Sequence, residues 1–167
     1  MVIETDRFLL RELTVDDVSA SYLGWLSDPV AKNWILTAKS TRKLSELREY
    51  VQQRTGRQDV LFLGIFSKLE KLHIGNIKYE PILCIEGRAE MGILIGDPAF
   101  RGKRVFAEVL AASATWLKQH RHIYRICLGV EAENLPAMSA YRNAGFVAET
   151  YLQRDNEPDI VRMVLNV

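Results

Sequence analysis

The chain has 167 residues, of which 48% are hydrophobic, and a net charge of +1. These values suit one compact domain spanning residues 1–167 and leave no overall positive field that would attract nucleic acid. Cys84 and Cys127 are flanked by isoleucine and leucine, which favours reduced core thiols over a disulfide framework. The N-terminus lacks an apolar signal core and no run is long enough to span a bilayer. We therefore expect a cytoplasmic protein that binds neither nucleic acid nor a membrane.

The first half of the chain predicts a strand over residues 7–12, followed by two helices and three more strands. The first helix follows Thr14-Val-Asp-Asp17, which resembles a capping box, and ends at Asp28-Pro29. The second is capped by Ser40 or Thr41 and ends at Gly56. Apolar runs that suit antiparallel hairpins then cover 60–67, 73–79 and 89–95.

The centre of the chain reads as a strand, a basic loop and a helix. The strand ends at Asp97-Pro98, and the loop Arg101-Gly-Lys-Arg104 follows. The sequence then changes to helical spacing, with one apolar face formed by Phe106, Val109, Leu110, Ser113 and Leu117. This arrangement aims the free N–H groups of a helix's first turn, and the positive end of its dipole, beyond the end of the strand. An anion is the expected occupant there, most commonly a phosphate.

The last part of the chain predicts a strand over 124–131, a helix over 134–144 ended by Gly145, and strands over 147–154 and 160–164. Because a helix connects strands 89–95 and 124–131, these two should be parallel neighbours. The sequence therefore predicts an α/β protein, a mixed α+β fold. Its sheet is twisted, mostly antiparallel and of about seven strands, with helices on both faces.

Two motifs in this order resemble those of the GCN5-related N-acetyltransferase (GNAT) superfamily. They are Arg101-Gly102-Lys103 at the strand-to-helix loop and Asn134-x-x-Ala137-x-x-x-Tyr141-x-x-x-Gly145-Phe146 about one βα unit later. Residues 5–11 and 22–29 are also similar to the opening of its ribosomal-protein-acetyltransferase-like (RimJ/RimL-type) branch, so the resemblance covers nearly the whole chain. It implies an acyltransferase whose two central parallel strands splay apart to hold acetyl-CoA.

The resemblance also implies which residues bind acetyl-CoA. The pyrophosphate would be held by backbone N–H groups of the basic loop, with charge from its cations, and the pantetheine arm by the splayed strand end and an asparagine amide. The residues implied are Ile93, Leu94, Ile95, Arg101, Gly102, Lys103, Arg104, Val105, Phe106, Asn134 and Tyr141. The family has small residues where this chain has Arg104 and Phe106. The Phe106 ring must therefore either crowd the cofactor or turn into the core.

For catalysis, the resemblance makes Tyr141 the general acid that protonates the departing CoA thiolate; the alternative is a core tyrosine. A phenol pKa of about 10 is close enough to a thiol's value of about 8.5 for this transfer. Candidate bases are Glu90 and Glu131 on the two central strands, each equally readable as a solvated carboxylate, and His73 is a further option. The amine attacks the thioester directly, so no nucleophilic residue is required. No cluster has metal-ligand spacing, and we expect no metal.

The acceptor is predicted to be a primary amine. The resemblance implies that residues 20–57 shape its cleft, with Tyr22, Trp25 and Trp34 as lining. The family resemblance leans towards an amino sugar or another small-molecule amine. The alternatives are a protein N-terminal acetyltransferase and a CoA-binding module without turnover, the latter motivated by Arg104 and Phe106. The C-terminal strands leave a homodimer open.

Overall fold

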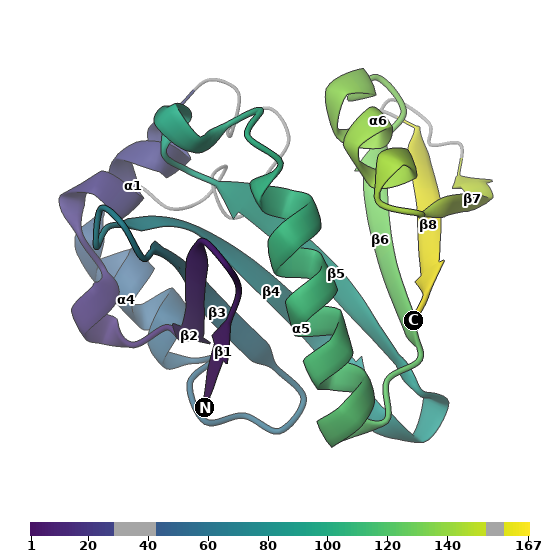
Figure 1. Ribbon diagram of the computed structural model, residues 1–167, viewed down its shortest axis with the longest axis horizontal. Helices are drawn as coiled ribbons and strands as arrows, with labels where there is room; N and C mark the ends of the chain where they lie inside the picture. The colour runs from purple at the N-terminus through teal and green to yellow at the C-terminus, as the bar shows by residue number, and fades with distance from the viewer. Residues whose placement is uncertain (29–42, 153–158) are drawn as a thin grey trace.

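The computed structural model describes residues 1–28, 43–152 and 159–167 (Figure 1). Its helices are α1 (Ala20–Ser27), α4 (Leu44–Gln52), α5 (Val105–Arg121) and α6 (Leu135–Asn143). Its strands are β1 (Val2–Glu4), β2 (Phe8–Glu12), β3 (Leu61–Ser67), β4 (His73–Leu83), β5 (Arg88–Ile95), β6 (Arg125–Glu131), β7 (Val147–Leu152) and β8 (Ile160–Asn166). No helix in these three ranges is both long and apolar enough to cross a bilayer.

The described strands form one sheet in the order β1-β2-β3-β4-β5-β6-β8-β7. Each neighbouring pair is antiparallel except β5 and β6, which are parallel. The predicted mixed, mostly antiparallel sheet is thereby confirmed. It has eight strands because β1, too short to show an alternating pattern in the sequence, pairs with β2 from Val2↔Arg11 to Glu4↔Leu9.

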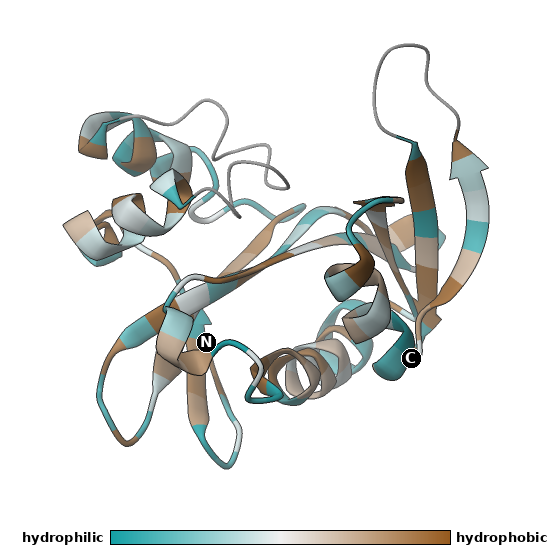
Figure 2. Ribbon diagram, turned by 90° about the horizontal axis from the view of Figure 1, so that it is seen from above, coloured by the Kyte–Doolittle hydropathy of each residue, from teal (hydrophilic) through white to brown (hydrophobic). Residues whose placement is uncertain are grey.

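Helices cover both faces of the sheet, as Figure 2 shows from above. On one face, the sheet packs against α5 and α6 in a large apolar cluster that includes Val109 and Leu117. On the other, α1 and α4 form a second cluster that includes Leu26 and Leu47. Strand β3 is apolar on both faces because Leu63 belongs to the first cluster while Phe62, one residue earlier, belongs to the second.

Local sequence signals placed several element ends correctly. Gly145 follows α6 with a φ of 96°, the left-handed conformation expected of a residue that ends a helix. Asp17 does close a capping box, accepting from the backbone N–H of Thr14 at 2.8 Å. That box, however, closes a separate 3₁₀ turn, Val15–Asp17. Helix α1 begins later, where the side chain of Ser19 accepts from the N–H of Tyr22.

Strand β4 runs four residues beyond its predicted end, through Pro81 to Leu83. It can do so because the register of β4 on β5 shifts between Tyr79 and Ile82, so that Pro81, which has no N–H, needs no ladder partner. Cys84 consequently lies in an exposed turn, and the expectation that it belongs to the core is wrong. Cys127, in the middle of β6, is buried as predicted. Ser40 and Thr41, the expected caps of the second helix, lie outside the described residues.

Candidate active site

The parallel strands β5 and β6 stay together for only a short distance. They pair from Arg88↔Arg125 to Glu90↔Cys127. Beyond that point β5 remains paired with β4 up to Ile95, and β6 remains paired with β8 up to Glu131. The two strands diverge in Figure 1, so residues 91–95 of β5 have no ladder partner on the β6 side among the described strands. The predicted splayed strand pair is confirmed, and on the β6 side this part of β5 has no described strand with which its backbone can pair.

The basic loop lies between the open end of β5 and the start of α5. Gly102 and Arg104 both have left-handed backbone, with φ of 72° and 59°, and both are exposed. The left-handed region is natural for glycine and strained for arginine, so the backbone at Arg104 has a conformation that would suit a glycine better. The loop leads directly into Val105, where the first-turn N–H groups of α5 have no partner within the helix.

Arg101 points away from the loop and towards neighbouring elements. Its guanidinium donates to the carbonyl oxygens of Ile95 at 3.1 Å and Gly96 at 3.0 Å. It also pairs with the carboxylate of Asp28, at the end of α1, at 2.9 Å. Arg101 therefore holds the loop against β5 and α1. Its predicted contribution to phosphate binding stays a prediction, and the other loop cations are Lys103 and Arg104, both exposed.

The structure brings Asn134, Tyr141 and Phe106 to the same side of the opened sheet. Asn134 caps α6, its side chain accepting from the N–H of Ala137 at 3.2 Å, as its position in the sequence indicated. The Tyr141 ring packs edge-on against Phe106 of α5, at a centroid distance of 5.4 Å, and against Phe146. Phe106 thus turns towards α6 and packs on the larger core cluster. Burial raises the pKa of Tyr141 to about 12, so its hydroxyl keeps its proton at neutral pH.

The three candidate bases lie in different surroundings. Glu90 pairs with Arg88 at 3.0 Å and with Arg162 of β8, so two guanidinium groups already hold its carboxylate. Glu131 ends β6, in the part of the strand that diverges from β5. His73, at the start of β4, donates from Nε2 to the carbonyl oxygen of Gly75 and to Oδ1 of Asn76, while its buried Nδ1 has no hydrogen-bond partner among the described residues. Burial lowers the pKa of His73.

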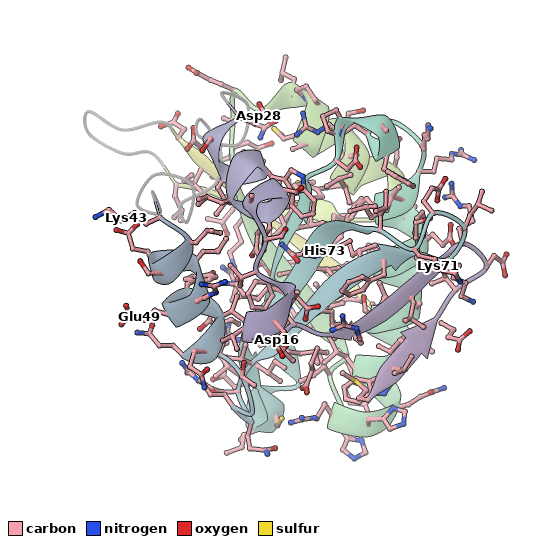
Figure 3. The ribbon with its side chains drawn as sticks, turned by 90° about the vertical axis from the view of Figure 1, so that its left-hand side faces the viewer. Asp16, Asp28, Lys43, Glu49, Lys71 and His73 are labelled. Atoms are coloured by element: carbon pink, nitrogen blue, oxygen red, sulfur yellow. The ribbon has the colours of Figure 1, made fainter. Side chains whose placement is uncertain are left out.

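The aromatic residues of α1 are packed rather than exposed. Tyr22 is 2% exposed and Trp25 is 9% exposed, and both rings meet the ring of His73. Figure 3 shows His73 beside α1 and Asp28 at the end of that helix. The indole of Trp25 also lies directly on Gly96, at the end of β5. Both aromatic rings therefore fix α1 on the sheet, and their role as acceptor lining stays a prediction. Trp34 lies outside the described residues.

Sequence reasoning missed the residues that hold the loop and the carboxylates in place. In the sequence, Asp28 indicates only the end of a helix, and no motif includes Arg162. Arg7 and Glu108, which contact one another beside the loop, come from segments about a hundred residues apart. No local pattern in the sequence connects such pairs. Among the described residues, no three histidine, cysteine, aspartate or glutamate side chains gather closely enough to hold a metal ion.

Several solved structures share this fold. An acetyltransferase of the GNAT family from Bacillus anthracis is 19% identical, with 99% of this chain and 98% of that chain covered and a TM-score of 0.84. RimL, a ribosomal L7/L12 alpha-N-protein acetyltransferase in complex with coenzyme A, is 17% identical, with coverage of 100% and 98% and a TM-score of 0.88. Spermidine N-acetyltransferase from Vibrio cholerae, in complex with CoA and spermine, is 23% identical, with coverage of 97% and 96% and a TM-score of 0.81. Comparison with curated proteins finds no match.

The likeness to these structures, at such identities, establishes the fold. The sequence itself matches the family model described as "Acetyltransferase (GNAT) domain" over residues 7–147, which is most of the chain. This match spans the opened strand pair, the basic loop and the helix that carries Tyr141. The chain therefore belongs to the GNAT acetyltransferase family and is an N-acetyltransferase.

Proposed function

We propose that the protein transfers an acetyl group from acetyl-CoA to a primary amine by direct attack in a ternary complex. The observation that carries this proposal is the end of β5–β6 pairing at Glu90↔Cys127, which leaves the backbone of residues 91–94 without a described strand partner on the β6 side, where a ligand with amide groups can bind. The pyrophosphate is assigned to the N–H groups of residues 102–106, with added charge from Lys103 and Arg104. Two of the similar structures are in complex with CoA, which supports the choice of donor.

The chain's contribution to the chemistry is to align the reactants and move protons. When acetyl-CoA is bound, its thioester supplies an activated acetyl group. A carbon–nitrogen bond forms to the neutral amine, the carbon–sulfur bond breaks, and Tyr141 donates its hydroxyl proton to the departing sulfur. The pKa of Tyr141, about 12, keeps the phenol protonated before the step. Apolar surroundings disfavour a thiolate as well as a phenolate, so a raised pKa of the departing thiol offsets the raised pKa of Tyr141.

The amine must lose a proton before or during attack. Glu90 is occupied by Arg88 and Arg162. We assign proton removal to Glu131, because it ends β6 in the part that diverges from β5, or to water, and we give Glu90 the role of linking β5 to β8. Replacing Glu131 with glutamine should then move the pH profile of turnover towards higher pH if the carboxylate is the base.

The acceptor we favour is a small-molecule amine such as an amino sugar. Solved relatives of similar fold acetylate different amines: one is a spermidine N-acetyltransferase and another acts on a ribosomal protein. A protein N-terminal amine is therefore the principal alternative. A screen against amino sugars, polyamines, aminoglycosides and N-terminal peptides separates these classes directly.

The test of the mechanism compares Tyr141→Phe with Tyr151→Phe. The first variant keeps the ring that packs on Phe106 and removes only the hydroxyl, whereas Tyr151 is exposed on β7 and serves as a matched control. We measure thiol release from acetyl-CoA with the accepted amine, and CoA binding by calorimetry. Tyr141→Phe should lower kcat by about a hundredfold or more with CoA affinity unchanged. Unchanged turnover would refute the role of Tyr141. CoA binding without turnover of any amine would favour the binding module.

A further inference from the structure

The segment between β1 and β2 is fastened to the first turn of α5 through one carboxylate. Glu108 accepts from the Thr5 hydroxyl at 2.6 Å, from the backbone N–H of Arg7 at 3.0 Å and from the Nε of Arg7 at 2.7 Å. Burial alone would raise the pKa of Glu108, but the hydrogen bonds from Thr5 and Arg7 outweigh it and lower that pKa. The carboxylate is therefore ionised at neutral pH, and its bonds are of the stronger, charge-assisted kind.

The same guanidinium also reaches the basic loop. Arg7 donates through Nη2 to the backbone carbonyl of Lys103 at 3.1 Å. One side chain thus ties a loop peptide to Glu108, five residues further along the chain. The segment between the two tied points, residues 104–107, contains most of the N–H groups assigned to the pyrophosphate.

Holding the carbonyl of Lys103 also fixes the direction of the next N–H group. The carbonyl of Lys103 and the N–H of Arg104 belong to one planar trans peptide, in which the two groups point in opposite directions. When Arg7 holds the carbonyl, the Arg104 N–H is turned to the side away from Arg7. Arg104 has left-handed backbone, with a φ of 59°, a conformation that an arginine leaves readily unless its neighbours hold it.

We propose that Arg7 and Glu108 are positioning residues that hold the basic loop and the first turn of α5 in the shape that binds the pyrophosphate of acetyl-CoA. This inference rests on the proposed function. Neither residue needs to touch the ligand. Their effect passes through the loop backbone, so it should act on the binding of acetyl-CoA and leave the chemical step unaffected.

The charge of Glu108 makes the test decisive. A negative charge in the first turn of α5 opposes the binding of an anion there, so on electrostatic grounds alone its removal should strengthen CoA binding. If Glu108 positions the loop, its removal should weaken binding. The two explanations predict opposite signs for the same variant, Glu108→Gln.

The experiment measures the Kd for CoA by calorimetry in the parent chain, Glu108→Gln, Arg7→Met and a control, Glu4→Gln. Glu4 lies on the same N-terminal hairpin as Arg7. Its carboxylate pairs with Lys68, which follows β3, at 2.9 Å and does not contact the basic loop. We expect Glu108→Gln and Arg7→Met to raise Kd about tenfold and the control to stay within about twofold. The KM for acetyl-CoA should rise in parallel while kcat is kept, and Arg7→Lys, which keeps the charge, should recover part of the loss.

Several outcomes would overturn the inference. The inference is wrong if Glu108→Gln binds CoA as tightly as the parent or more tightly. It is also wrong if Glu4→Gln loses as much CoA affinity as Glu108→Gln, because that would indicate general loosening of the hairpin. Should Glu108→Gln not fold, Thr5→Val removes one bond of the same carboxylate and should raise Kd about twofold to threefold; an unchanged Kd would count against the proposal. A parent chain that does not bind CoA would refute the proposed function, and the positioning role with it.

Discussion

Gly96, the residue after β5, is the point where α1 rests on the sheet, and Gly96→Ala tests this contact. A β-carbon at this position would lie 2.0 Å from Cδ2, 2.2 Å from Cε3 and 2.5 Å from Cγ of Trp25. Because carbon atoms in contact are about 3.5 Å apart, the indole would have to retreat by about 1.5 Å. It has little room, since the ring centroids of Tyr22 and His73 lie 5.5 Å and 5.0 Å from that of Trp25.

The expected cost of Gly96→Ala is about 3 kcal/mol of unfolding free energy. Overpacking a core by one methyl group typically costs about 1–3 kcal/mol, and complete loss of a buried tryptophan's packing about 3–5 kcal/mol. A ring displaced but not expelled should fall between these. Urea denaturation measures the difference, with Gly92→Ala as the control. Gly92 lies on β5 too, but an added β-carbon there would meet no atom within 4 Å, so its cost should stay below about 0.5 kcal/mol.

A double-mutant cycle identifies the cause of the loss. In a Trp25→Leu background the smaller side chain leaves space for the new methyl group, so Gly96→Ala should cost less than about 1 kcal/mol there. The reasoning is refuted if Gly96→Ala costs the same free energy of unfolding in both backgrounds, or less than about 0.5 kcal/mol in the parent. In either case, the contact of Trp25 with Gly96 does not stabilise α1 on the sheet.

Three further predictions follow from exposure and backbone conformation. Arg104→Gly should leave the free energy of unfolding unchanged or raise it by up to about 1 kcal/mol, because the left-handed backbone suits glycine. Arg104→Val should lower it by about 1–2 kcal/mol. Denaturant titrations measure both, and equal effects of the two variants would contradict the strain at this position. Burial raises the pKa of Tyr141 to about 12 from an ordinary value of about 10. Its contribution to stability is therefore complete below about pH 10 and lost as the pH rises towards 12. Phenolate absorbance followed alongside unfolding should show this tyrosine titrating late, and early titration would refute its burial. Cys84 should react with a thiol reagent in the folded protein and Cys127 only on unfolding, and mass analysis of the labelled peptides distinguishes the two.

Much of the fold could be read from the sequence because the relevant signals are local. The period of apolar residues placed α5 with its buried face, and the glycine after α6 marked the end of that helix. The strand-helix-strand connection also fixed the parallel pairing of β5 and β6. Where local reading failed, a longer-range partner had decided the matter: pairing with β5 carried β4 past Pro81, and Cys84 was thereby left in an exposed turn.

The basic loop shows which properties only the tertiary structure decides. Its composition indicated an anion site, and by type alone Arg101 was one of three equivalent cations. The folded chain distinguishes them, because Asp28 lies close enough to pair with Arg101 whereas Lys103 and Arg104 remain exposed. Similarly, the sequence shows only that Tyr22 and Trp25 are aromatic, whereas the folded chain packs both rings against His73 and the indole of Trp25 on Gly96.

The sequence by itself determined the elements, their order, the family motifs and the positions of the strand-to-helix loop and Tyr141, since each depends on residues close together in the chain. Only the tertiary structure decided where β5 and β6 part, which arginine braces the loop, and that Arg7 and Glu108 meet across about a hundred residues. Hydrogen bonds and ion pairs act over a few ångströms in space, and chain order does not specify which distant groups come within that range.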